Sequence, residues 1–328
     1  MIGTPGGPIP LGLFGFRHTA LPPGTRSITV SHTYRQKSIT ARLIVPEPLT
    51  PACCARTLRC MRVVLLGKGG SGKSTLAGLL SAEFANLGGR VVAVDADTVP
   101  GLAQVLGMEA TDDWFLAGMA VRDNGGWRLE GSPAEIVDRC SREGAGGVRF
   151  LQVGNADATL KDFEFRRESY LDRWSGTVAF NTVARTFDDE AGWVVVDLQG
   201  GTLQVAGGMA GTSGIALLVV EPFAKSLLTA RRFVGMGAWP PGMRLVGVAN
   251  KVANPDDEDY VEAELARLGV PLWGSIPLDP AVKRAERDGQ PLVTLDRDGP
   301  VRLAVSGLAD RLRSAAGVPD ALGSTSRG

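Results

Sequence analysis

A run of nine residues at 67–75 has the residue types and spacing of a phosphate-binding loop. The run meets the pattern G-x-x-x-x-G-K-[ST] and consists of Gly67, Lys68, Gly69, Gly70, Ser71, Gly72, Lys73, Ser74 and Thr75. In such a loop glycines let backbone N–H groups approach phosphate oxygens, the lysine reaches the β- and γ-phosphates, and the hydroxyl ligates Mg²⁺. Those roles fall here to Gly67 and Gly72, to Lys73, and to Ser74. The sequence therefore predicts a nucleotide site that uses magnesium.

The segments on both sides of this loop are those that a phosphate site needs. The apolar run at 62–66 predicts a buried strand, and apolar residues recur at helical spacing through 76–87 until Gly88 and Gly89. A helix that begins at the loop directs its N–H groups and the positive end of its dipole at the phosphates. A glycine-rich turn that matched the pattern by chance would lack both flanks.

Two carboxylates follow the next predicted strand, at 91–94. Asp95 and Asp97 are two positions apart, so the alternation of a strand points both side chains the same way. Ligands gather at the carboxyl ends of strands in open α/β sheets, which predicts that both acids face the phosphates. The alternative is a pair of capping acids at a turn, a place that aspartate favours.

A further apolar strand at 192–196 ends in Asp197, which is the Walker B pattern. We expect Asp197 to bind the Mg²⁺ shell, usually through water. Gly200 follows in a loop at 198–201, where a glycine allows an N–H to approach the γ-phosphate and report its loss. The alternative is a plain buried strand with a polar end.

The lysine directly after the first glycine narrows the class of phosphate-binding loop. With Lys68 it reads Lys-Gly-Gly-x-Gly-Lys-Ser, which resembles the deviant Walker A motif of the MinD/ParA family of ATPases. The resemblance implies that Lys68 crosses a dimer to the partner's phosphates, that Asp97 positions or polarises the attacking water, and that Asp95 supports Mg²⁺ from a second layer. A second cation at the γ-phosphate would stabilise charge on the transferred group. A solvated surface lysine is the alternative, and Thr98 stands where the family often has proline.

Two loops bear on the base of the nucleotide. The GTPase element N-K-x-D pairs its aspartate with guanine, but position 253 is Ala253, while Asn250 could still contact adenine. The segment from Pro277 to Asp279 resembles the family segment that lies along the adenine. We therefore expect ATP, with Asn250, Pro277 and Asp279 among the binding residues.

Three short segments resemble the sequences of one branch of the family. This branch is the CooC-type ATPases, which assist nickel insertion into carbon monoxide dehydrogenase. The segments are DAD at 95–97, VVEP at 219–222 and NKV at 250–252. That branch binds metal with a Cys-x-Cys pair, whereas this chain reads GNAD at 154–157. Nickel delivery would therefore need Cys140 to pair across a dimer, or the cysteines before residue 61.

Composition divides the chain near residue 60. Seven of the 35 basic residues but one of the 35 acidic residues lie in 1–60, which leaves the remainder with a net charge of −6. An acidic body argues against nucleic-acid binding through a basic face. The first 60 residues superficially fit a transit peptide, although we favour Met61 as the natural start. No apolar run in them reaches the roughly 18 residues of a membrane span.

We expect an α/β fold: a mostly parallel P-loop NTPase sheet with helices on both faces, in three layers. This domain would occupy 61–315, between a disordered or mis-annotated extension at 1–60 and a flexible tail at 316–328. After residue 60 the chain has no histidine and one cysteine, Cys140, so disulfides are not expected and acid–base chemistry must use carboxylates, lysines or water. An amphipathic helix near 301–312 is expected to dock on the sheet rather than on a membrane.

The predicted function is a cytoplasmic Mg²⁺-dependent ATPase that forms a homodimer around ATP and resets a surface for an unidentified client protein. Lys73 and the partner's Lys68 would stabilise the transition state, Asp97 would orient water, and Ser74 and Asp197 would hold Mg²⁺. Neither nucleic acid nor a membrane is an expected partner. Two alternatives are a nucleotide-binding scaffold with negligible hydrolysis and a P-loop kinase whose acceptor region lies within 99–190.

Overall fold

The structure, a computed structural model, describes residues 25–34, 37–46, 61–97, 101–109, 120–123, 126–152, 192–206, 213–236, 239 and 242–317. The chain divides into two compact units, Met1–Thr57 and Leu58–Gly328. In the first unit, strands β1 (Thr25–Tyr34) and β2 (Lys37–Pro46) pair as an antiparallel hairpin. We did not predict this hairpin, because residues 1–60 show little sustained periodicity. The domain boundaries near residues 60 and 315 stay predictions.

The second unit is built on an eight-stranded sheet with the order β12-β11-β10-β3-β9-β4-β8-β7. The strands are β3 (Met61–Gly67), β4 (Val91–Asp95), β7 (Arg142–Glu143), β8 (Arg149–Gln152), β9 (Trp193–Asp197), β10 (Ser213–Val220), β11 (Gly242–Val252) and β12 (Leu272–Pro277). All neighbouring strands are parallel except β7, which runs antiparallel to β8. The predicted α/β class with a mostly parallel sheet is confirmed. A separate hairpin joins β5 (Ala120–Asp123) to β6 (Gly126–Leu129).

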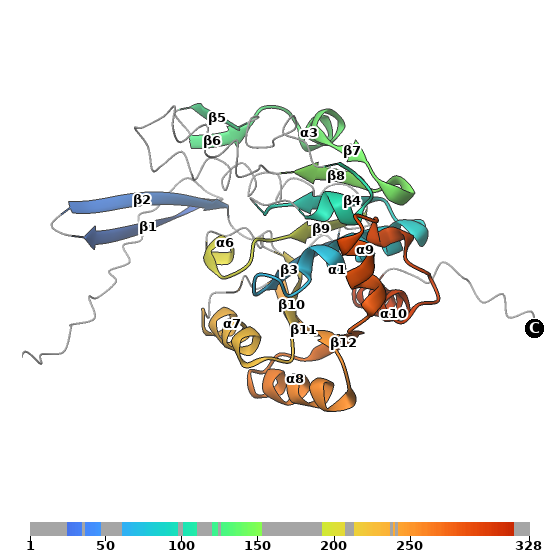
Figure 1. Ribbon diagram of the computed structural model, residues 1–328. Helices are drawn as coiled ribbons and strands as arrows, with labels where there is room; N and C mark the ends of the chain where they lie inside the picture. The colour runs from blue at the N-terminus through green and yellow to red at the C-terminus, as the bar shows by residue number, and fades with distance from the viewer. Residues whose placement is uncertain are drawn as a thin grey trace, which may run out of the picture. The chain divides into compact units, whose positions relative to one another are not determined.

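Helices cover both faces of this sheet (Figure 1). They are α1 (Lys73–Asn86), α2 (Leu102–Val105), α3 (Pro133–Cys140), α6 (Leu203–Ala206), α7 (Ala224–Gly235), α8 (Pro255–Arg267), α9 (Pro280–Arg287) and α10 (Pro300–Ala315). On β3, Val63 and Leu65 pack in one core with residues of α1, α2 and α10, whereas Val64 and Leu66 pack in another with residues of α3, α7 and α8. Strands that are buried on both faces read as continuous apolar runs, which is how the sequence predicted them.

Local sequence explains the start of α3, and the predicted docking of the last helix is confirmed. Ser132 caps α3: its hydroxyl accepts the Glu135 N–H, and the Glu135 carboxylate accepts the Ser132 N–H at 2.6 Å. The bond from the Ser132 backbone N–H lowers the pKa of Glu135. The last helix, α10, buries Val301, Val305 and Leu308 in the core that includes Trp273 of β12, so it docks on the sheet. In the described part of the chain, every helix is too short or too polar to cross a membrane.

The sheet order brings four carboxyl ends together. Strand β3 lies between β10 and β9, and β4 follows β9. The phosphate loop follows β3, Asp95 and Asp197 end β4 and β9 opposite each other, and Glu221 follows β10. In open α/β sheets this is the edge at which ligands bind.

Candidate nucleotide site

Two glycines let the loop after β3 turn between strand and helix. Gly67 has φ of 151°, and a Cβ there would lie 2.5 Å from the Val219 carbonyl oxygen. Gly72 has φ of 90° immediately before α1, and its Cβ would lie 2.2 Å from the Asn250 amide nitrogen. Any side chain at either position would displace the loop, so these two glycines fulfil the steric requirement that the motif implies.

Four successive carbonyl groups of the loop accept hydrogen bonds from side chains. Lys73 Nζ donates to Lys68 O at 3.1 Å, and Lys68 Nζ donates to Gly69 O at 3.1 Å. The next two carbonyls take bonds from β11: Lys251 Nζ donates to Gly70 O at 2.6 Å, and Asn250 Nδ2 to Ser71 O at 2.7 Å. With the loop carbonyls held in this way, Lys68 and Lys73 of the loop, Lys251 of β11 and the first-turn N–H groups of α1 can face an anion.

Lys73 lies inside the site rather than on the surface. The residue is 6% exposed. Burial lowers the pKa of its ammonium, an effect that the negative charges of Asp197 and Asp97 partly oppose. The charges around Lys73 are thus arranged to keep a cation at the position where the motif places the β- and γ-phosphates.

Asp197 differs from the other described acidic groups of the site in being deeply buried with an unsatisfied carboxylate. It is 1% exposed, and among the described residues neither carboxylate oxygen has a hydrogen-bond partner of good geometry. Burial, together with the negative charge of Asp95, raises the pKa of Asp197 to about 8, although the neighbouring Ser74 hydroxyl acts in the opposite direction. A buried carboxylate without partners is costly unless a cation balances it. Asp197 and Ser74 therefore fit a Mg²⁺ ion whose other ligands are water and phosphate oxygens.

Asp95 has a different environment from Asp197, although the two are paired between strands. Its carboxylate accepts three backbone N–H groups: from Asp97 at 3.0 Å, Gly101 at 3.1 Å and Leu102 at 3.0 Å. Burial raises the pKa of Asp95 to about 6, and these hydrogen bonds limit the rise. Asp95 thus holds the segment that carries Asp97 and begins α2. These hydrogen bonds are of the kind that the capping alternative describes, and a second-layer role of Asp95 at Mg²⁺ stays a prediction.

The loop after β9 touches the phosphate loop directly. A Cβ on Gly200 would lie 2.6 Å from Gly69 N, and Gly201 N donates to Gly67 O at 3.1 Å. Gln204 of α6 ties the same loop to the end of β4, since it accepts the Gln199 N–H at 2.8 Å and donates to Ala96 O at 2.7 Å. Loss of a phosphate group from the phosphate loop would therefore affect both the loop after β9 and the end of β4.

The three residues predicted to lie near the adenine base each have a different structural role. Asn250 braces the loop through Ser71 O, and Pro277 ends β12 beside Val252 of β11. Asp279 caps α9, because its carboxylate accepts the Ala281 N–H at 2.8 Å. The Thr75 hydroxyl donates to Glu286 of α9 at 3.3 Å. Adenine contact by Asn250, Pro277 and Asp279 stays a prediction.

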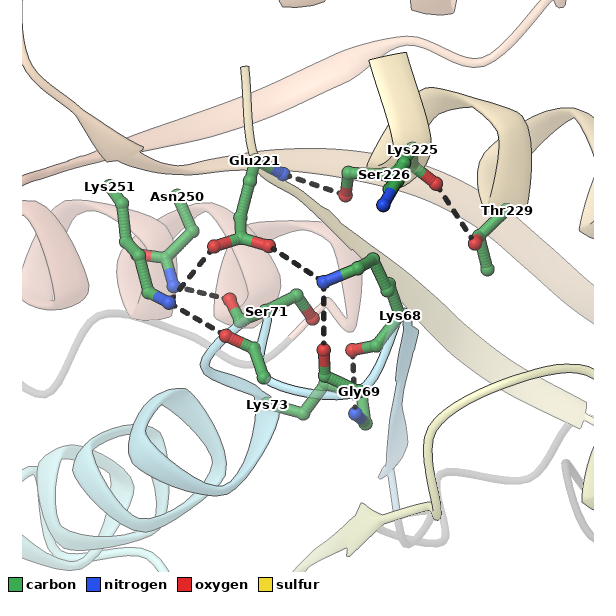
Figure 2. Close-up of polar contacts among 11 residues, drawn as sticks. Lys68, Gly69, Ser71, Lys73, Glu221, Lys225, Ser226, Thr229, Asn250 and Lys251 are labelled. Carbon is green, nitrogen blue, oxygen red and sulfur yellow. Dashed lines mark hydrogen bonds and ion pairs between the residues drawn. The ribbon is translucent and has the colours of Figure 1, made fainter. Parts of the chain in front are cut away.

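Two residues of the site were not assigned to it from the sequence. Glu221 and Lys251 form an ion pair of 2.9 Å next to the phosphate loop, and Lys68 lies 3.8 Å from the other oxygen of Glu221. Figure 2 shows Glu221 between these two lysines. The sequence held one indication of their role. Glu221 directly follows an apolar strand and Lys251 lies at the carboxyl end of another, which is where the residues of a ligand site gather. Thr98 and the segment 154–157 lie outside the described residues.

Curated proteins with similar sequences support the predicted branch of the family. The chain is 26% identical over 243 residues to the carbon monoxide dehydrogenase accessory protein CooC of Rhodospirillum rubrum, which covers 70% of this chain and 88% of that protein. It is also 26% identical over 265 residues to a cytosolic Fe-S cluster assembly factor, the NUBP2 homolog of Trichoplax adhaerens, with 74% and 90% covered.

Solved structures share the fold. The septum site-determining protein MinD of Pyrococcus horikoshii, in complex with Mg-ADP, has a TM-score of 0.60 at 21% identity, covering 79% of this chain and 98% of that one. A ParA family ATPase of Chlorobium tepidum has a TM-score of 0.57 at 16% identity, covering 76% and 98%. Residues 63–292 match the CobQ/CobB/MinD/ParA nucleotide binding domain. The resemblance inferred from Lys68 and its loop is confirmed, and the chain belongs to the CobQ/CobB/MinD/ParA family of nucleotide-binding domains.

Proposed function

We propose that this protein is a Mg²⁺-dependent ATPase that works as a dimerisation switch for a client protein. The observation that carries the proposal is Asp197, a buried carboxylate whose oxygens have no hydrogen-bond partner of good geometry among the described residues, beside Lys73 and Ser74 at the end of the phosphate loop. Asp197 and Ser74 would hold Mg²⁺, which would supply positive charge to balance the carboxylate and the phosphates of ATP.

Each residue of the site has a proposed role. Lys73 binds the phosphates from its own subunit, and Ser74 and Asp197 hold Mg²⁺. Asp97 orients the attacking water, and Asp95 holds the Asp97 segment through its three backbone hydrogen bonds. When bound, Mg²⁺ supplies charge that stabilises the transferred phosphoryl group. Gly200, packed against Gly69, is placed to respond when that group is lost.

Dimerisation and a client protein are supported by the exposure of Lys68 and by the relatives of this chain. Lys68 is 39% exposed at its side chain, so it is accessible to a second subunit. One relative is named as an accessory protein of carbon monoxide dehydrogenase, and another as an Fe-S cluster assembly factor. These names support a client for this chain. We further propose a cytoplasmic location and a domain at 61–315, with 1–60 and 316–328 outside it.

Phosphate release by the purified protein tests the enzymatic part of the proposal. We expect slow Mg²⁺-dependent hydrolysis that Asp97→Ala reduces by about 10²-fold or more, because a water-positioning group is lost. Asp259→Ala, at an exposed position of α8, is the matched control and should keep the wild-type rate. Equal rates for the wild type and Asp97→Ala would favour the nucleotide-binding scaffold. Phosphate recovered on a small molecule would instead indicate a kinase.

A further inference from the structure

Lys68 of the phosphate loop and Lys251 of β11 share one carboxylate, that of Glu221. Glu221 Oε1 lies 2.9 Å from Lys251 Nζ, and Glu221 Oε2 lies 3.8 Å from Lys68 Nζ (Figure 2). Glu221 is 7% exposed, whereas the side chains of Lys68 and Lys251 are 39% and 40% exposed. The carboxylate is therefore enclosed, and both lysines have access to solvent or ligand on their other sides.

Glu221 is held rigidly at its backbone. It directly follows β10, and its N–H donates to the Ser226 hydroxyl at 3.0 Å. Ser226 lies in the first turn of α7 and is itself buried. A buried carboxylate needs a balancing cation, and this one is fixed where two cations reach it.

The two ion pairs are not equivalent. Lys251 also donates to Gly70 O at 2.6 Å, and its backbone has φ of 59°, a left-handed conformation that its surroundings must maintain. Lys68 has the longer contact with Glu221, and its ammonium donates a hydrogen bond to the carbonyl of Gly69, the next residue in the chain. Lys251 is thus the fixed partner of Glu221, and Lys68 is the one that can leave without exposing an unbalanced carboxylate.

We propose that Glu221 is a positioning residue that keeps Lys68 within its own subunit until a nucleoside triphosphate and a second copy of the chain replace this contact. The inference rests on the proposed dimerisation switch. A triphosphate carries more negative charge than one carboxylate and offers several acceptor oxygens, so it attracts the ammonium more strongly. Once Lys68 leaves, Lys251 still neutralises Glu221. The contact delays association in the absence of ATP and is exchanged when ATP binds.

The first test examines the ion pair in nucleotide-free protein, without any enzymatic readout. The ¹⁵Nζ signal of Lys68, assigned with Lys68→Arg, reports how fast its ammonium hydrogens exchange with solvent. We expect Glu221→Gln to accelerate this exchange by about fivefold, the size expected of a partly exposed ion pair. Glu264→Gln is the matched control, because Glu264 is also 7% exposed and pairs with two arginines, Arg231 and Arg267, on α7 and α8. Equal exchange in the wild type and Glu221→Gln would overturn the proposal.

The second test measures self-association with Mg²⁺ and a non-hydrolysable ATP analogue by sedimentation. Glu221→Gln should lower the dimer dissociation constant by about fivefold, because the resting contact no longer competes. The same substitution in a Lys68→Met background should change nothing, and an equal gain there would overturn the proposal. If the wild type associates and Glu221→Gln associates no more tightly, the proposal is also overturned. A wild type that stays monomeric would contradict the proposed dimerisation switch instead, and the exchange measurement would still decide whether Glu221 holds Lys68.

Discussion

At the scale of single residues, two aspartates on paired strands affect the nucleotide-free fold in opposite ways. Asp95 and Asp197 lie opposite each other where β4 pairs with β9. The Asp95 carboxylate accepts three backbone N–H groups, whereas the Asp197 oxygens have no hydrogen-bond partner of good geometry among the described residues. Unsatisfied N–H groups and unbalanced buried charges both cost stability. Asp95 therefore stabilises its loop, while Asp197 costs stability until a cation binds.

This contrast predicts different outcomes for the same substitution. Asp95→Ala should lower the free energy of unfolding by about 1–3 kcal/mol, because it leaves backbone N–H groups without their acceptor. Asp197→Ala should leave that free energy unchanged or raise it, and should abolish the extra stability that Mg²⁺ with nucleotide gives the wild type. Chemical denaturation with and without Mg-nucleotide measures both effects. Equal losses in nucleotide-free protein would contradict this account of the two carboxylates.

Some site residues could be predicted from the sequence because they obey local patterns. Lys73 and Ser74 belong to one short motif, and Asp197 ends an apolar strand. Glu221 and Lys251 are 30 positions apart and follow no pattern that joins them. They meet because the whole of β10 pairs in parallel with β11, which is a property of the sheet order.

At the scale of elements, the packing of α1 on α2 depends on a missing side chain. A Cβ on Gly78 of α1 would lie 2.3 Å from a methyl carbon of Val105 in α2. Helix α2 is the element whose first N–H group, that of Leu102, binds Asp95. Close contact between these helices thus helps to place the segment that carries Asp97.

Two glycine substitutions in helices should have effects of opposite sign. Gly78→Ala should destabilise the protein by about 1–3 kcal/mol, because the added methyl group forces α2 away from α1. Gly307→Ala is the control: nothing lies within 4 Å of its Cβ position in α10, so it should stabilise by about 0.5–1 kcal/mol through helix propensity. Thermal and chemical unfolding measure both. A Gly78→Ala protein as stable as the wild type would contradict the proposed tight contact.

Elements were predictable where the pattern was long and apolar. The buried strands β3, β9 and β10 are continuous hydrophobic runs, and the Ser132 cap follows a known residue pattern. Strand β7 has only Arg142 and Glu143, and it exists because it pairs with the edge of β8. Arginine and glutamate have no strong preference for strands, so the sequence does not predict β7. Its extended conformation results from pairing with β8.

At the scale of the whole molecule, the class of the sheet was predictable and the order of its strands was not. Alternating apolar strands and amphipathic helices indicate a parallel sheet covered on both faces. The placement of β3 between β10 and β9 depends on contacts between distant segments, which periodicity does not reveal. That order is what sets Lys68, Lys73, Asp197 and Glu221 around one loop, and the proposed mechanism depends on it.

The central claim is that two subunits share one triphosphate, with Lys73 from one and Lys68 from the other. Mixing Lys68→Ala with Lys73→Ala subunits tests it most directly, because a mixed dimer then keeps one complete site if Lys68 acts on its partner. An equimolar mixture should hydrolyse ATP at about a quarter of the wild-type rate, since random pairing makes half of the dimers mixed. Activity no higher than the mean of the two variants alone would contradict the claim.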